Sequence, residues 1–171
     1  FYLSSSNTNT FYSNRIFNCE YGFYGGSSSN YNIFTNNLAS DNIVGFLMSS
    51  SSYNIFTNNI ASNNNEGFKL SLSNYNRLTN NLSSNNTRSA PGYGLFNSGF
   101  ELDNSANNYF AQNTADSNKG YAFYISGSSS AGDTFEKNNI IIAPQNVDTW
   151  VYNSINASFD FTNNYWVSSD S

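Results

Sequence analysis

A repeat with a period of 22 residues is the feature that most limits how this chain can fold. The segment "SSYNIFTNNIASNN" at residues 51–64 is preceded by "SNYNIFTNNLASDN" at residues 29–42 and followed by "SNYNRLTNNLSSNN" at residues 73–86. Poorer copies lie before and after these three, so about seven units are expected in the 171 residues. A fixed period of roughly 20 to 50 residues is typical of solenoids, in which each unit packs only on its neighbours.

The residue types indicate that the units are built from strands rather than helices. Phe, Tyr, Ile, Thr and Ser dominate the repeats, and short runs such as "GFLM" at residues 45–48 show no continuous helical stripe. Clusters of Asn, Ser and Gly interrupt these runs every few residues. We therefore predict an all-β, single-stranded parallel β-solenoid of about seven coils, each of roughly 22–26 residues, forming one domain over residues 1–171.

Coils stacked about 4.8 Å apart turn equal positions of the repeat into columns. The first asparagine of each pair is expected to turn inward and form a ladder of amide hydrogen bonds. This predicted ladder contains Asn36, Asn58 and Asn80. An aromatic column in the core is expected to contain Phe34, Phe56, Phe110 and Phe135. Alternation along the strands places Leu47, Lys69 and Glu101 on the outer surface, with an exposed ion pair between the last two.

Two segments resemble the right-handed parallel β-helix repeats of pectin-lyase-like and NosD-like proteins. The first is "FTNNLASDN" at residues 34–42 with the "GFLM" run after it, and the second is "NNYW" at residues 163–166. The resemblance implies that the solenoid is a right-handed parallel β-helix. It implies less about function, because these proteins include polysaccharide lyases and hydrolases, carbohydrate-binding modules, phage tailspikes, archaeal surface proteins and a periplasmic copper-maturation factor.

Charge and residue content narrow the classes of function. The chain has 6 Lys and Arg against 11 Asp and Glu, so it has no basic surface for nucleic acid. Only 10% of its residues are charged, against the usual ~25%, and an uncharged polar surface of this kind suits an extracellular or cell-surface protein. The chain contains no His, one Met and one Cys, which leaves no copper site and no multi-cysteine metal site. Cys19 is expected to be a small buried thiol.

The chain carries no sign of membrane insertion. No stretch approaches the ~20 consecutive apolar residues that span a bilayer, and no positively charged apolar leader opens the sequence. Because it begins at Phe1 rather than at Met, we expect it to be a processed or excised piece.

The acidic residues offer few candidates for catalysis. Glycoside hydrolysis needs two carboxyl groups roughly 5 to 9.5 Å apart, and neighbouring coils could bring Glu66 near Asp41, or one coil could hold Glu101 beside Asp103. Such pairs arise by chance when 11 acidic residues are spread over the coils, so we predict no catalytic residue and no resident cofactor. Ca²⁺ is the one candidate ion, with oxygen ligands from Glu101, Asp103 and Asn104.

Two stretches lengthen the repeat. One is an insertion loop at residues 85–98, whose Tyr93 and Phe96 would either stack on a sugar or a neighbouring subunit, or fold back as padding. The other is an extended late coil at residues 140–156. Three asparagines match the acceptor pattern for glycan attachment. They are Asn85, Asn81 and Asn156, of which Asn85 is the best placed because it opens the insertion loop.

The two ends of the chain are apolar, and neither shows an amphipathic helix that would cap a solenoid. The candidate self-association residues are Phe1, Tyr2 and Leu3 at the start, and Tyr165 and Trp166 near the finish. We therefore predict an extracellular structural or adhesive β-solenoid that polymerises head to tail with itself into a surface layer or filament. The alternative is a protein that binds or processes polysaccharide, with Tyr31, Tyr53 and Tyr75 as a ladder for sugars.

Overall fold

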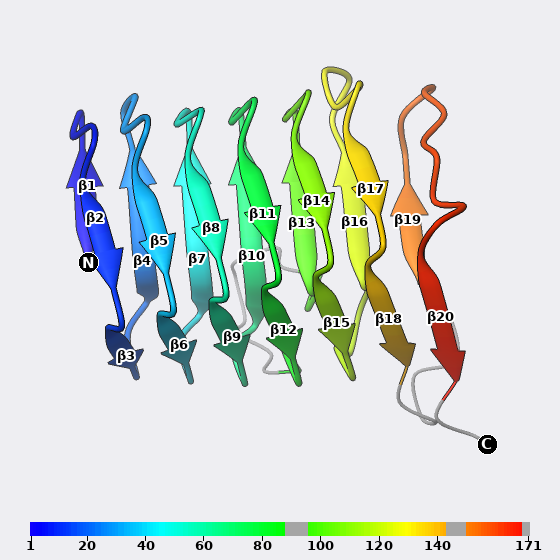
Figure 1. Ribbon diagram of the computed structural model, residues 1–171, viewed down its shortest axis with the longest axis horizontal. Helices are drawn as coiled ribbons and strands as arrows, with labels where there is room; N and C mark the ends of the chain where they lie inside the picture. The colour runs from blue at the N-terminus through cyan, green and yellow to red at the C-terminus, as the bar shows by residue number, and fades with distance from the viewer. Residues whose placement is uncertain (88–95, 143–149, 169–171) are drawn as a thin grey trace.

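The fold is a stack of short strands wound through three long sheets. The structure, a computed structural model, describes residues 1–87, 96–142 and 150–168. In these residues every regular element is a strand. The same residues contain no helix that is long and apolar enough to cross a membrane. The strands of successive coils pair in parallel, so that about seven coils are stacked along the long axis of the molecule (Figure 1). The expected all-β parallel solenoid is confirmed.

Each sheet takes one strand from each coil in turn. The first sheet consists of β1 (Tyr2–Ser4), β4 (Tyr21–Gly26), β7 (Val44–Ser49), β10 (Glu66–Ser71), β13 (Phe100–Asp103), β16 (Phe123–Ser126) and β19 (Val151–Asn153). The second sheet consists of β2 (Thr10–Tyr12), β5 (Ile33–Thr35), β8 (Ile55–Thr57), β11 (Arg77–Thr79), β14 (Tyr109–Ala111) and β17 (Thr134–Glu136). The third sheet consists of β3 (Arg15–Phe17), β6 (Leu38–Ser40), β9 (Ile60–Ser62), β12 (Leu82–Ser84), β15 (Thr114–Asp116), β18 (Asn139–Ile142) and β20 (Tyr165–Ser168).

The register of the sheets follows the sequence repeat. Phe56 lies opposite Phe34 on one side and Leu78 on the other. Leu78 in turn lies opposite Phe110, although the insertion loop separates these two residues in the sequence. The insertion therefore does not change the register between the strands on either side of it.

The asparagine pairs lie at the corners between the second and third sheets, and their two members do different things. The first member is exposed and has a left-handed backbone, with φ of 56° at Asn58, a conformation that asparagine tolerates better than most residues. The second member points inward. Nδ2 of Asn59 donates to Oδ1 of Asn81 at 3.0 Å and to the carbonyl oxygen of Phe34 at 2.9 Å.

The predicted ladder of Asn36, Asn58 and Asn80 is therefore wrong by one residue. The left-handed residue turns the chain outward, and the residue after it is the one that faces the interior. The ladder consists of Asn14, Asn37, Asn59, Asn81, Asn113, Asn138 and Asn164.

The other two corners carry ladders that the repeat pattern did not single out. The corner between the first and second sheets holds Asn9, Asn32, Asn54, Asn76, Asn108 and Asp133, together with a ladder of buried serines. The corner between the third and first sheets holds Asn42, Asn64, Asn86 and Asn118. Each corner is thus closed by side chains that satisfy buried backbone groups.

The core consists of stacked rings. Phe34 and Phe56 are parallel, with centroids 4.6 Å apart, and Phe110 stacks on Phe135 at 5.2 Å. Phe34, Phe56, Phe110 and Phe135 all lie in this column, with Leu78 between its two halves. A second column on the first sheet meets it edge to face and contains Phe23, Phe46, Phe68, Phe100 and Phe123.

Two expectations about exposure are wrong. Leu47 and Glu101 face outward from the first sheet as predicted, yet both are buried, because each lies between long side chains of the neighbouring coils in the register. Cys19 is exposed rather than buried, because it lies on the end face of the described stack, at the position that Asn42 occupies in the second coil.

Candidate functional site

The candidate site is a cluster of charged residues on the outer face of the first sheet. Alternation along β10 and β13 directs Phe68 and Phe100 into the core and Lys69 and Glu101 outward, where the latter two are neighbours in the register. Nζ of Lys69 lies 2.7 Å from Oε1 of Glu101. Only 20% of the Lys69 side chain and 2% of the Glu101 side chain are exposed. The predicted ion pair forms, but it is largely withdrawn from water.

Glu66 begins β10 and fastens the end of the insertion loop to this face. Its carboxylate accepts hydrogen bonds from the backbone N–H groups of Phe96, Asn97 and Ser98, the last two at 2.8 Å. The Phe96 ring stacks on Tyr124, with centroids 3.9 Å apart. This end of the insertion folds back on the sheet, whereas Tyr93 lies outside the described residues.

Burial controls the ionisation of both glutamates. Burial, and next the repulsion from Glu101, raise the pKa of Glu66 to about 8, against the lowering by its backbone donors. Burial also raises the pKa of Glu101, although Lys69 acts in the opposite direction. Oε2 of Glu101 is buried without a hydrogen-bond partner. Carboxyl groups perturbed in this way are found at functional sites and also in structural ion-pair networks.

The two carboxyls that influence each other are not one of the pairs considered from the sequence. Glu66 interacts with Glu101 of the next coil, whose charge repels the ionised form of Glu66. The signal that could have found this pair is the column that contains Glu66. Its neighbours in the preceding coils are Val44 and Tyr21, so an acid occupies a position that is otherwise filled by less polar side chains.

The predicted oxygen ligands for Ca²⁺ are engaged with other groups. The Asp103 carboxylate accepts hydrogen bonds from the Ser71 hydroxyl at 3.3 Å and from the Asn104 amide at 3.0 Å, while Glu101 binds Lys69. Across residues 1–87, 96–142 and 150–168, no group of three or more His, Cys, Asp or Glu side chains could hold a metal ion. Ca²⁺ binding stays a prediction.

The tyrosine ladder is exposed but its faces are covered. Tyr31, Tyr53 and Tyr75 are 56%, 45% and 51% exposed. Successive rings are nearly parallel, with centroids 5.1 Å apart, so each ring covers the face of the next. A sugar that packs on aromatic faces would find only the two outer faces of this stack. The ladder is better suited to shielding a corner of the solenoid than to binding a chain of sugars.

The ends of the solenoid leave core columns open. Phe1 stacks on Phe23, with centroids 5.3 Å apart, and so continues the inner column of the first sheet, yet 54% of it is exposed. Tyr2 is 72% exposed and Leu3 is half-buried. In the last coil, Tyr165 and Trp166 are 65% and 39% exposed. The residues predicted for self-association thus lie on the two end faces.

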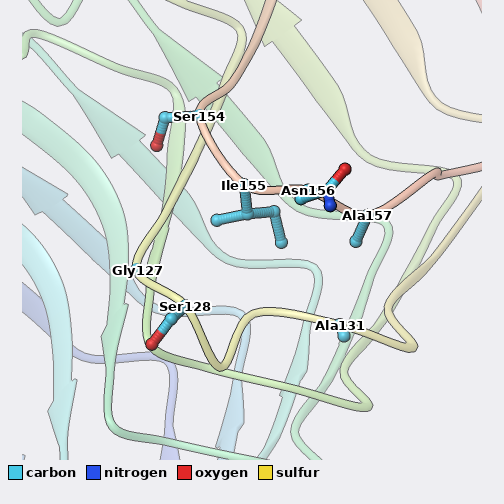
Figure 2. Close-up of a pocket in the computed structure, with 7 residues that line it drawn as sticks. All are labelled: Gly127, Ser128, Ala131, Ser154, Ile155, Asn156 and Ala157. Carbon is cyan, nitrogen blue, oxygen red and sulfur yellow. The ribbon is translucent and has the colours of Figure 1, made fainter.

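A pocket of about 470 Å³ lies between the last two coils. Figure 2 shows that Gly127, Ser128 and Ala131 of the β16–β17 connection line one side, and that the segment from Ser154 to Ala157 lines the other. None of the lining side chains is ionisable, so the pocket offers shape and hydroxyl or amide groups but no acid or base.

The three predicted glycan acceptors differ in access. Asn81 is 1% exposed and its amide is held in the corner ladder, so it cannot carry a glycan in the folded chain. Asn85 and Asn156 are exposed, and glycan attachment at these two residues stays a prediction.

Comparison with known proteins identifies the fold family and nothing closer. Neither the curated proteins nor the solved structures contain a match to this chain. The family described as "Right handed beta helix region" matches residues 1–141, which include the first five coils and most of the sixth. The right-handed winding implied by the sequence resemblance agrees with this match. The chain therefore belongs to the right-handed β-helix family.

Proposed function

We propose that this protein is a structural or adhesive β-solenoid of the extracellular space or cell surface, and that it associates head to tail with copies of itself into a surface layer or filament. The observation that carries the proposal is the match between the two end faces. Each column of equivalent side chains that begins in the first coil ends in the last coil. Head-to-tail contacts of this kind propagate unless a ring closes.

The apolar parts of the two faces correspond column by column. In the first coil, Phe1, Phe11 and Ile16 lie in the inner columns of the three sheets and are only partly covered. In the last coil, the same columns end at Val151, Phe161 and Trp166. A copy stacked in register would pair Phe1 with Val151, Phe11 with Phe161, and Ile16 with Trp166. Such stacking would remove large apolar side chains from water.

The polar groups of the two faces are complementary as well. At an interior rung, Oδ1 of Asn37 accepts two hydrogen bonds from Asn14, at 2.9 and 3.0 Å. Oδ1 of Asn14 occupies the first rung of the described ladder, where a coil stacked on this face would offer it an equivalent donor. Asn164 is the last rung of the same ladder, and the second hydrogen of its Nδ2 group would donate to Oδ1 of Asn14, as the equivalent hydrogen does between interior rungs. Strands β19 and β20 would likewise pair with β1 and β3 of the next copy, as parallel edge strands do.

Light scattering over a wide range of concentration tests the proposal. The 171-residue chain should gain mass with concentration, and Phe1→Arg or Trp166→Arg should shift it towards the monomer because each places a charge in the end contact. Tyr53→Arg is the matched control, since Tyr53 is an exposed aromatic in the middle of the solenoid. A wild-type chain that stays monomeric would contradict the proposal, as would assembly that is lost only in Tyr53→Arg.

Polysaccharide binding or processing is the alternative function. Its support is the buried pair of Glu66 and Glu101, whose raised pKa values suit proton transfer. A screen against acidic and neutral polysaccharides with Ca²⁺ present distinguishes the two functions. Turnover that is abolished by Glu66→Gln or Glu101→Gln would favour the alternative.

A further inference from the structure

The Lys69–Glu101 contact is a poor stabiliser if it is only an ion pair. The two side chains project side by side from neighbouring coils, with Nζ 2.7 Å from Oε1. Oε2 of Glu101 is buried and has no hydrogen-bond partner. Withdrawing two charges from water costs more than their attraction returns unless the remaining polar atoms are also satisfied. The stability gained from a simple salt bridge therefore does not explain why these two groups are buried together.

The surroundings disfavour the charged form of Glu101. In the register, Leu47 lies before Lys69 and Tyr124 lies after Glu101, and both neighbours are buried. The Phe96 ring stacks on Tyr124, and the backbone N–H group of Phe96 donates a hydrogen bond to the Glu66 carboxylate. Burial raises the pKa of Glu101, as expected for a carboxyl group that is removed from water. Transfer of one proton from the ammonium to the carboxylate would leave a neutral amine against a neutral acid.

We propose that Lys69 and Glu101 condense into an intramolecular amide bond that links two neighbouring coils covalently. The proton of the Lys69 ammonium passes to Glu101, and the freed lone pair of Nζ attacks Cδ of Glu101. A C–N bond forms, and one carboxyl oxygen leaves as water with the transferred proton and one further proton from nitrogen. An ammonium and a carboxylate thus give an amide and one water, with no oxidant, cofactor or second substrate.

Proximity and burial are what make this condensation favourable here and not in solution. Groups held in reacting geometry behave as if present at roughly 10⁵–10⁸ M. The product is neutral, so it removes the buried charges of the starting pair. Glu66 acts as a positioning residue, because it fastens Phe96 over Tyr124 and so keeps water from this face. The link goes beyond the proposed assembly, since it requires only one copy of the chain.

Mass spectrometry of the purified chain tests the proposal directly. The intact mass should be lower than the sequence mass by one water. After trypsin digestion under denaturing conditions, cleavage after Lys69 should be blocked, and residues 16–77 should remain joined to residues 89–119. Lys69→Arg and Glu101→Met should each restore the full mass and yield separate peptides. Lys137→Arg, which changes an exposed lysine of a later coil, should keep both the deficit and the joined peptides.

The wild-type chain alone decides the outcome, so the proposal does not depend on the variants folding. A full sequence mass after prolonged incubation at neutral pH would overturn it. A water deficit with separate peptides would also overturn it, because the loss would then come from dehydration elsewhere. Glu66→Gln should slow formation of the link and alter its dependence on pH. If the link forms in Glu66→Gln at the wild-type rate at every pH, Glu66 has no role in its formation.

Discussion

At the scale of single residues, the end of one ladder shows how strictly a corner selects its side chain. Asn108 donates to Oδ1 of Asp133 from its backbone N–H at 2.7 Å and from Nδ2 at 3.1 Å. Asp133 has no amide to donate onward, and its Oδ2 is buried without a partner. Burial raises the pKa of Asp133 to about 7, against the lowering by its Asn108 donors. An acid at this rung is tolerated best when it carries a proton.

Replacing Asp133 by Asn should stabilise the chain above neutral pH. The folded-state pKa of Asp133 is raised from 3.8 to about 7, so its contribution to stability is complete below the lower value and is lost as the pH rises through the higher one. Asn carries no charge and restores the donor, so denaturant unfolding at pH 8 should show a gain of about 1–2 kcal/mol. The gain should shrink towards pH 4.

The control for this prediction is Asp116→Asn on β15, a partly exposed carboxyl group of the third sheet. Its stability should stay within about 0.5 kcal/mol of the wild type at both pH values. Equal stability of Asp133→Asn and the wild type at pH 8 would show that the buried carboxylate of Asp133 does not lower the free energy of unfolding.

At the scale of the strands, glycine sets how closely the first sheet approaches the corner beside it. A Cβ atom at Gly67 would meet Oγ of Ser83 at 1.9 Å and the carbonyl oxygen of Gly99 at 2.5 Å. A Cβ atom at Gly25 would instead meet the Sδ atom of Met48 at 2.8 Å. The first obstacle includes backbone of the next coil, whereas the second is a flexible side chain that can move.

Gly67→Ala should therefore destabilise the protein more than Gly25→Ala. We expect the free energy of unfolding to fall by about 2–3 kcal/mol for Gly67→Ala, the range seen when a packed site is overfilled, and by about 1 kcal/mol or less for Gly25→Ala. Thermal and denaturant unfolding measure both. If the two variants lose the same stability, the close approach of β10 and β13 at this corner does not limit the packing.

At the scale of the whole molecule, stability should vary along the axis because each coil contacts only its neighbours. Coils in the middle of the solenoid bury their rings on both sides, as Phe68 does between Phe46 and Phe100. The last coil is covered on one side only, and its Tyr165 is 65% exposed. Local opening therefore requires less free energy at the ends than in the centre.

Hydrogen exchange should show this gradient directly. Amides of β7, β10 and β13 should exchange most slowly, and those of β19 and β20 fastest, when the chain is dilute. If copies associate head to tail, protection of β1, β3, β19 and β20 should rise with concentration while that of β10 stays constant. Uniform protection along the axis at low concentration would contradict the stacked-coil account of stability.

The sequence by itself determined the architecture, because the fold is a direct consequence of periodicity. Stacking in register places identical residues on one another, so Phe34 must lie beside Phe56 whatever the details of the corners. The repeat also predicted that Lys69 and Glu101 would meet. These relations need only the period and the two-residue alternation of a strand.

Tertiary structure alone decided which member of each asparagine pair turns inward and how far the charged cluster is buried. The first choice depends on a left-handed backbone at residues such as Asn58. Two consecutive asparagines in a sequence do not reveal which of them adopts this conformation. The second depends on the end of the insertion, where the N–H groups of Phe96 to Ser98 reach Glu66. Those contacts lie outside the repeat, so no period predicts them. Burial, in turn, sets the ionisation of Glu66 and Glu101, because the cost of a charge depends on the water left around it.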